Sequence, residues 1–133
     1  MKRKGIVLFA FCVLLGACTQ KGDLAHNSRN SLNWAGVYEG TVPGANSRIH
    51  VVITLNKDES FLVTTQYLDK SEEIFTNTGT FTWSADGSTI TLKDTSPQYY
   101  QVGEGKLIQL DMSGKKITGE LADSYELTQT ERR

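Results

Sequence analysis

Alternating apolar and polar residues dominate the chain from Trp34 onward. The clearest example is segment 48–55, in which one face carries Ile49, Val51, Ile53 and Leu55. A period of two is typical of a β-strand that buries one face. No window has the 3.6-residue periodicity of an amphipathic helix. The pattern therefore predicts an all-β domain.

Turn residues divide this region into short strands. Asn56–Glu59, Ser84–Ser88 and Ser113–Lys115 have the composition of tight turns. Gly79, in the middle of the longest apolar segment, predicts a bulge or a sharp bend. The candidate strand segments are residues 34–42, 48–55, 60–68, 74–83, 89–93, 99–102, 106–112, 115–121 and 125–129.

Short turns between successive strands favour a small antiparallel meander of about seven to eight strands, closed into a β-barrel. Closure removes the exposed sheet edges that invite aggregation. The inward positions are mostly large, which predicts a largely packed interior with at most a small cavity. The aromatic residues are interpreted mainly as core, and a ligand cavity is the alternative. They are Trp34, Tyr38, Phe61, Tyr67, Phe75, Phe81, Trp83 and Tyr100.

The first eighteen residues have the features of a lipoprotein signal. Three basic residues, at positions 2–4, precede an apolar run at 6–14 that is too short to cross a bilayer. The run ends in Leu15-Gly16-Ala17-Cys18, which resembles the bacterial lipobox. Cleavage is expected between Ala17 and Cys18, with lipid attached to the Cys18 thiol. The alternative is an ordinary signal peptide that contains a chance cysteine.

Three segments are expected: a signal peptide at 1–17, lipidated Cys18 with a flexible polar tether at 18–32, and the barrel domain at 33–130. Two or three acyl chains on one residue anchor a protein to a membrane. Thr19, directly after Cys18, favours the outer membrane as the destination of the lipoprotein, because Asp at this position favours inner-membrane retention in enteric bacteria. The expected location is the cell envelope, on the periplasmic side of the outer membrane.

Maturation changes the cysteine content and the charge. Cys12 is removed and Cys18 is acylated, so the mature domain has no free thiol for redox chemistry or for metal binding. Removal of residues 1–17 leaves 11 basic and 15 acidic residues, a net charge of −4. A mildly acidic domain without a basic stripe is a poor nucleic-acid binder.

The remaining polar residues predict neither a metal site nor a catalytic site. His26, His50 and Met112 have no partners at ligand spacing. Ser47 and His50 fall on opposite faces of one strand, and no Gly-x-Ser-x-Gly motif is present. We therefore expect no enzyme activity and no cofactor apart from the covalent lipid. The carboxylates expected in solvated turns are Asp58, Glu59, Glu72 and Glu73.

Four segments resemble the N-terminal domain of the NlpE family of copper-resistance and envelope-stress lipoproteins. They are Trp34–Pro43, Ile53–Asp58, Gly79–Trp83 and Tyr100–Gly103, and the resemblance extends over Asn33–Gln129. It implies a small antiparallel barrel similar to bacterial lipocalins. It also implies an outer-membrane lipoprotein that contacts an envelope sensor kinase.

The chain departs from the family pattern at one loop. Members typically carry Pro-Cys-Ala-Asp-Cys, whereas this chain has Pro43, Gly44, Ala45, Asn46 and Ser47 and is one residue shorter before Ile49. Copper binding or redox switching through that thiol pair is therefore expected to be lost, and so is the second domain that some members carry. Loops on rigid scaffolds often make contacts, so residues 43–47 are a candidate partner loop.

These observations predict a lipid-anchored envelope protein without enzyme activity. The expected role is envelope-stress sensing and signalling, or copper homeostasis, through contacts with a sensor kinase or another envelope protein. One alternative is a lipocalin-like binder of a small apolar ligand. Another is an inhibitor of a wall-degrading enzyme such as lysozyme.

Overall fold

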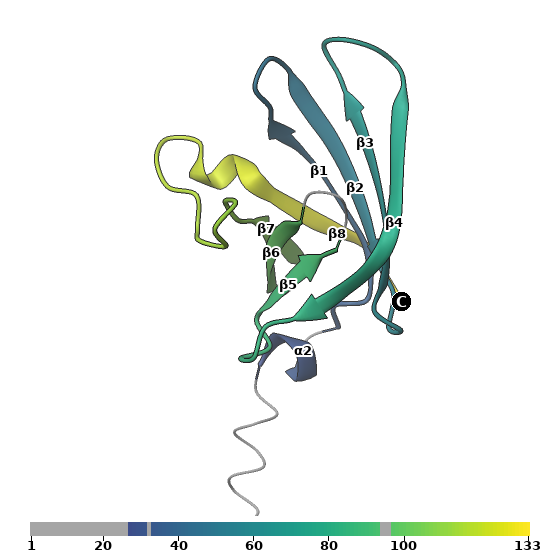
Figure 1. Cartoon of the computed structure of the whole chain (residues 1–133), viewed down its shortest axis with the longest axis vertical. Helices are drawn as coiled ribbons and strands as arrows, with labels where there is room; N and C mark the ends of the chain where they lie inside the picture. The colour runs from purple at the N-terminus through teal and green to yellow at the C-terminus, as the bar shows by residue number, and fades with distance from the viewer. Residues whose placement is uncertain (1–26, 32, 94–96) are drawn as a thin grey trace, which may run out of the picture.

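Eight antiparallel strands in sequence order form one closed barrel, in which β1 pairs with both β2 and β8 (Figure 1). The computed structural model describes residues 27–31, 33–93 and 97–133. The predicted all-β meander barrel is confirmed. The elements are α2 (Ser28–Ser31), β1 (Gly36–Pro43), β2 (Arg48–Leu55), β3 (Ser60–Tyr67), β4 (Ile74–Trp83), β5 (Thr89–Leu92), β6 (Gln98–Gly103), β7 (Lys106–Gln109), the 3₁₀ turn η2 (Ala122–Tyr125) and β8 (Glu126–Arg132).

Several predictions about the N-terminal region fall outside the described residues. These are the signal peptide, the cleavage and lipidation site at Ala17 and Cys18, and His26. Among the residues that are described, no helix is long and apolar enough to cross a membrane.

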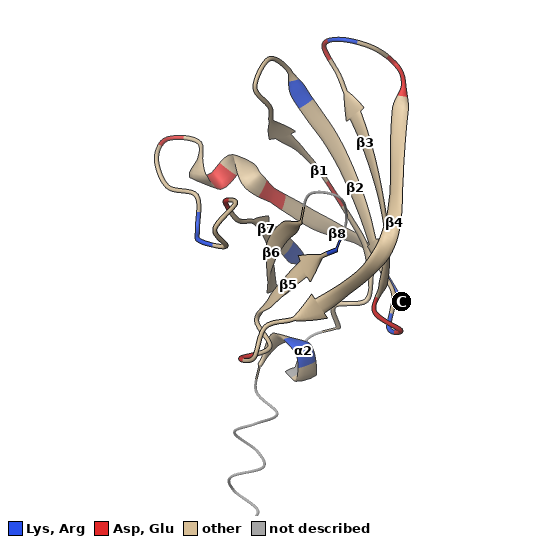
Figure 2. Cartoon of the chain, viewed as in Figure 1, with Lys and Arg blue, Asp and Glu red and all other residues tan. Residues whose placement is uncertain are grey.

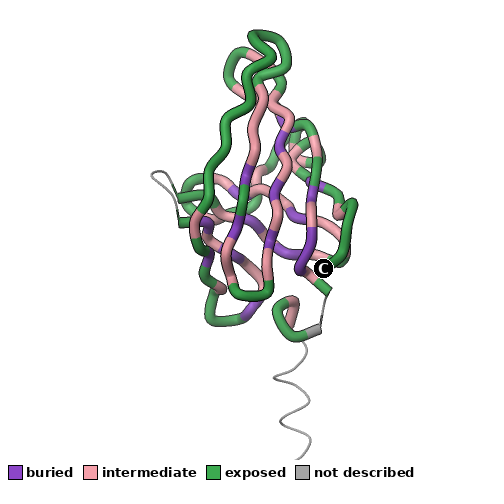
Figure 3. The backbone as a smooth tube through the Cα atoms, turned by 90° about the vertical axis from the view of Figure 1, so that its right-hand side faces the viewer, coloured by how far each residue is buried: buried purple, intermediate pink, exposed green. Residues whose placement is uncertain are grey.

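The alternating pattern places the core where the sequence predicts it. On β2, Val51, Ile53 and Leu55 are buried and the residues between them are only partly buried. The buried residues gather in the lower part of the barrel, away from the projecting loops (Figure 3). The core consists of Tyr38, Val42, Val51, Ile53, Leu55, Phe61, Val63, Phe81, Ile90, Leu92, Tyr100, Val102, Leu107 and Leu127.

The barrel wall is tall on one side and short on the other (Figure 1). Strands β1 to β4 have eight to ten residues each and form two long hairpins. Strands β5 and β7 have only four residues each. Because β5 pairs only with Phe81–Trp83 of β4, the upper part of β4 continues beyond its neighbour.

Two glycines are required by close packing. A Cβ on Gly79 would lie 2.9 Å from the Lys93 carbonyl oxygen and 3.0 Å from the Phe61 ring. A Cβ on Gly40 would lie 2.8 Å from the Glu126 carbonyl oxygen, where β8 crosses β1. Of the bulge or sharp bend predicted at Gly79, the bulge is wrong, because β3 and β4 pair without a register shift. The glycine instead makes room for the packed Phe61 ring.

Three turns share an Asp-x-Ser arrangement. The carboxylates of Asp58, Asp86 and Asp111 each accept hydrogen bonds from the backbone N–H and the hydroxyl of the serine two residues later. Hydrogen bonds stabilise the charged form of each aspartate and lower its pKa. The main donors are Ser60 to Asp58, the Ser84 hydroxyl and then Ser88 to Asp86, and the Lys115 N–H and then Ser113 to Asp111. The motif therefore stabilises the β2–β3 turn, the β4–β5 turn and the turn that follows β7.

Helix α2 packs against the closed end of the barrel. The Ser28 hydroxyl donates to the Val102 carbonyl at 2.8 Å, and the Arg29 N–H donates to the Gly87 carbonyl at 2.9 Å. Trp34 Nε1 donates to the Arg29 carbonyl at 3.1 Å. The predicted flexible tether was therefore too long, because residues 28–31 within it are helical and bound to the barrel.

The segment between β7 and β8 differs from the prediction. The strand expected at 106–112 ends at Gln109, and the strand expected at 115–121 is absent. One isolated bridge joins Leu110 and Lys116, and Gly119 has a φ of 104°. Apolar alternation alone is not sufficient for a strand when no neighbouring strand is available to pair with it.

Candidate functional site

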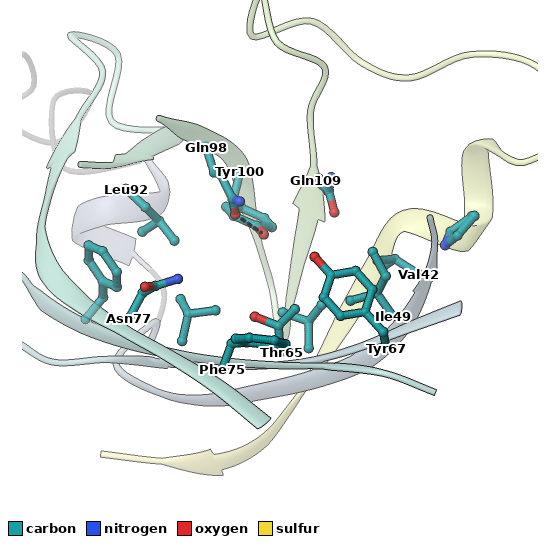
Figure 4. Close-up of a pocket in the computed structure, with 14 residues that line it drawn as sticks. Val42, Ile49, Thr65, Tyr67, Phe75, Asn77, Leu92, Gln98, Tyr100 and Gln109 are labelled. Carbon is teal, nitrogen blue, oxygen red and sulfur yellow. Dashed lines mark hydrogen bonds between the residues drawn. The ribbon is translucent and has the colours of Figure 1, made fainter. Parts of the chain in front are cut away.

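A cavity of about 400 Å³ opens at the upper end of the barrel, between the two long hairpins and the short strands (Figure 4). Its apolar wall includes Val42, Ile49, Val51, Val63 and Leu92. The volume falls within the range of small-molecule pockets. The predicted packed interior is therefore correct for the lower half of the barrel and wrong for the upper half.

Aromatic residues line the cavity from its base to its rim. Phe61 and Tyr100 are buried at the base. Tyr67 and Phe75 lie at the rim, 39% and 44% exposed, with their rings edge to face at 6.0 Å. The interpretation of the aromatic residues as core is thus wrong for Tyr67 and Phe75, which lie where the barrel wall extends beyond β5.

Uncharged polar side chains also face the cavity: Thr65, Asn77, Gln98 and Gln109 (Figure 4). The Tyr100 hydroxyl donates to Gln98 Oε1 at 3.1 Å. Burial raises the pKa of the Tyr100 phenol, so the phenol stays neutral at physiological pH. Among the described residues that line this cavity, none is charged.

These amides were not predicted from the sequence, although the sequence contains a signal for one of them. Asn77 lies on the same alternating face of β4 as Phe75 and Phe81, so it must point inward. A polar residue at an inward position of a barrel strand indicates a wet or ligand-binding space. Gln98 and Gln109 carry no such signal, because they lie at strand ends.

The candidate partner loop, Pro43–Ser47, is the tip of the β1–β2 hairpin. The Gly44 N–H donates to the Ser47 carbonyl at 2.9 Å, and Ala45 and Asn46 are exposed. A Cβ on Gly44 would lie 2.6 Å from that carbonyl oxygen. Pro43 lines the cavity, so the loop lies at its mouth, and the geometry of the loop disfavours any side chain at position 44.

The other polar candidates do not come together. His50 is on the outer face of β2, where its Nε2 lies 2.8 Å from Glu39 Oε2 and its Nδ1 lies 3.4 Å from Thr41 Oγ1. Met112 is 74% exposed in the loop after β7. Within residues 27–31, 33–93 and 97–133, no three His, Cys, Asp or Glu side chains form a group that could hold a metal ion.

Comparison with known proteins identifies relatives of this fold. Residues 38–120 match the model of the NlpE N-terminal domain. A crystal structure described as that of a proposed lipoprotein from Shewanella oneidensis is 43% identical, with a TM-score of 0.75, and the match covers 80% of this chain and 97% of the other.

A second solved structure is the Cpx pathway activator NlpE from Escherichia coli. It is 27% identical with a TM-score of 0.54, and the match covers 64% of this chain and 46% of the other. No curated protein matches the sequence. The family is not one of known enzymes. On the family match and the identity to the Shewanella protein, the chain belongs to the NlpE N-terminal domain family.

Proposed function

We propose that this protein is a lipid-anchored protein of the bacterial cell envelope that signals envelope stress through protein contacts at the open end of its barrel. The Escherichia coli relative is described as an activator of the Cpx pathway, and the Shewanella relative as a proposed lipoprotein. The outer membrane is the proposed location, from the lipobox and Thr19.

One observation carries this proposal: large apolar side chains are exposed together at the tip of the β3–β4 hairpin. Tyr67 ends β3 and Leu68 follows it, and Ile74 and Phe75 begin β4; their exposed fractions range from 37% to 59%. Apolar side chains that cluster on the surface of a soluble domain commonly mark interaction sites. The tip is therefore the surface at which a partner would bind.

The position of the tether also favours the open end of the barrel as the surface that binds a partner. Eight residues, 19–26, separate Cys18 from Asn27, and the connection can span at most about 30 Å. Asn27 lies beside Gly87 at the closed end of the barrel. A lipid on Cys18 would hold the closed end near the membrane and leave the open end free for a partner.

The test is an envelope-stress reporter in cells that lack or overproduce the full-length protein. We expect overproduction to raise the reporter several-fold and Ile74→Asp to abolish that rise. Met112→Asp is the matched control, because Met112 is also apolar and is more exposed than Ile74 but lies in a different loop. An unchanged reporter on both deletion and overproduction would contradict the proposal.

A second candidate function is favoured by the cavity itself: binding of a small, uncharged amphipathic molecule. The apolar wall suits a hydrocarbon portion, and the amides of Asn77, Gln98 and Gln109 suit a neutral polar head. Monoacylglycerol is a suitable probe, with the corresponding fatty acid as the charged comparison. We expect monoacylglycerol to bind more tightly than the fatty acid, and Phe75→Ala to weaken the binding of monoacylglycerol. If neither lipid binds, this function is excluded.

Copper homeostasis and inhibition of a wall-degrading enzyme remain predictions from the sequence. A copper titration and a lysozyme assay test them directly.

A further inference from the structure

The upper part of β4 has a free edge. Residues 74–80 pair with β3 on one side, whereas β5 pairs only with Phe81–Trp83 on the other. The contact with β5 ends where the Lys93 N–H donates to the Thr80 carbonyl at 3.0 Å. Among the described residues, no strand pairs with the outer side of Ile74–Thr78, which we call the β4 edge.

The hydrogen bonds that flank the β4 edge show which of its groups face outward. The Phe81 N–H donates to the Glu59 carbonyl on the β3 side, whereas the Thr80 carbonyl accepts from β5. Backbone groups alternate in direction along an antiparallel strand. The N–H and C=O groups of Ile74, Thr76 and Thr78 therefore point away from β3, toward the free side.

None of the usual protective features is present on this edge. Natural sheet edges carry lysine, proline or a bulge that prevents pairing with another chain. The segment Ile74–Thr78 has no charged residue, no proline and no register shift, and each of its residues is exposed (Figure 2). It thus presents a regular row of donors and acceptors to solvent.

We infer that the β4 edge binds an extended peptide segment of a partner protein by strand addition. This inference rests on the proposed function and names the kind of partner contact that the open end makes. Phe75 and Asn77 line the cavity from β4. Alternate side chains of an added strand would therefore face the same cavity, which gives side-chain selectivity as well as backbone hydrogen bonds.

Charge identifies the occupant as a segment with a basic residue near one end. Glu72 and Glu73 directly precede β4, and neither forms an ion pair with another described residue. A second copy of this chain would offer an uncharged strand and its own two glutamates. A peptide with lysine or arginine beside the edge complements these carboxylates. Because Ile74–Thr78 carries no charge, we expect the rest of the peptide to be apolar or neutral.

Thr76→Pro tests the edge selectively. Proline removes the Thr76 N–H, which points away from β3, so the β3–β4 pairing is retained. Thr76→Val is the matched variant, because it removes the hydroxyl and keeps the N–H. The probe is a fluorescein-labelled peptide, Lys-Lys-Val-Thr-Val-Thr-Val, titrated by polarisation against the mature protein, with amide exchange of Ile74, Thr76 and Thr78 measured by NMR.

We expect the peptide to protect these amides, Thr76→Pro to weaken binding at least tenfold, and Thr76→Val to bind like the wild type. Glu72→Gln with Glu73→Gln should weaken binding and reduce its dependence on salt. No binding, or equal binding by the proline variant, would overturn the inference. Dimerisation of the wild type that Thr76→Pro abolishes would also overturn it, in favour of a second copy.

The stress reporter separates this inference from the proposed function. If the wild type raises the reporter signal and the Thr76→Pro and Thr76→Val variants raise it by the same amount, the strand-addition inference is wrong and the signalling proposal stands. If the wild type leaves the reporter unchanged, the signalling proposal fails, and the peptide titration alone decides whether the edge binds.

Discussion

The guanidinium of Arg48 and the carboxylate of Asp69 join the two projecting hairpins at the mouth of the barrel. Arg48 Nη2 lies 3.1 Å from Asp69 Oδ1, and the Arg48 backbone N–H donates to Asp69 Oδ2 at 3.0 Å. The Leu68 N–H in turn donates to the Arg48 carbonyl at 2.9 Å. These bonds extend the β2–β3 pairing into the loop that carries the exposed apolar tip.

Asp69→Asn is therefore expected to loosen the tip without unfolding the barrel. The variant keeps the shape of the side chain but loses its charge, so faster amide exchange is expected at Arg48 and Leu68. Both ionic side chains are well exposed, so the midpoint of urea unfolding should change little. Glu131→Gln, which removes the distant pair with Arg133, is the control and should leave the tip unchanged. Unchanged exchange at Leu68 in Asp69→Asn would contradict this role.

Acid should weaken the turns. Hydrogen bonds lower the pKa of the carboxyls of Asp58, Asp69, Asp86 and Asp111 in the folded state. A lowered folded pKa contributes stability that is fully present above the unfolded pKa of about 4 and is lost as the pH falls through the folded value. We therefore expect these groups to contribute a constant amount from pH 5 to 7 and less below pH 4.

Asp111→Asn isolates one of these contributions. The Asp111 carboxylate accepts from the Lys115 N–H, the main cause of its lowered pKa, and from Ser113. The variant should be less stable than the wild type at pH 6, and the difference should shrink at pH 2.5. Urea unfolding at both pH values measures it, and a difference that is independent of pH would contradict the assignment.

Two phenylalanines on the same face of β4 should differ sharply in their effect on stability. Phe81 is 1% exposed, so Phe81→Ala is expected to lower the free energy of unfolding by about 3–5 kcal/mol. Phe75 is 44% exposed at the cavity rim, so Phe75→Ala should cost about 1 kcal/mol or less. Urea denaturation of both variants decides the point. Similar losses would mean that the cavity is filled by the protein itself.

The loop that carries thiols in other family members should accept a cysteine at only one of its two positions. A side chain at Gly44 would meet the Ser47 carbonyl, so Gly44→Cys is expected to cost about 1–3 kcal/mol. Ser47→Cys needs no such movement and should change stability by about 0.5 kcal/mol or less. Thermal unfolding of the single variants under reducing conditions measures both. Equal stability of the two variants would mean that the hairpin tip adapts freely.

Which side chains of a strand point into the barrel follows from the sequence alone. Alternation over 48–55 and 74–83 predicted the bounds of β2 and β4 and their inward residues, because a strand places successive side chains on opposite faces regardless of its neighbours. The turn positions followed from local chemistry too, as at Asp86-Gly87, where the glycine has a φ of 71°.

Where the barrel is filled and where it is open depends on the pairing of all eight strands. The cavity and the β4 edge exist because β5 pairs with only three residues of β4, and no other strand of the described chain pairs with that side of Ile74–Thr78. Segment 115–121 alternates like a strand but has only one bridge, at Lys116. Strand pairing joins residues far apart in sequence, so the extent of each pairing, and with it the candidate site, depends on the complete set of neighbours.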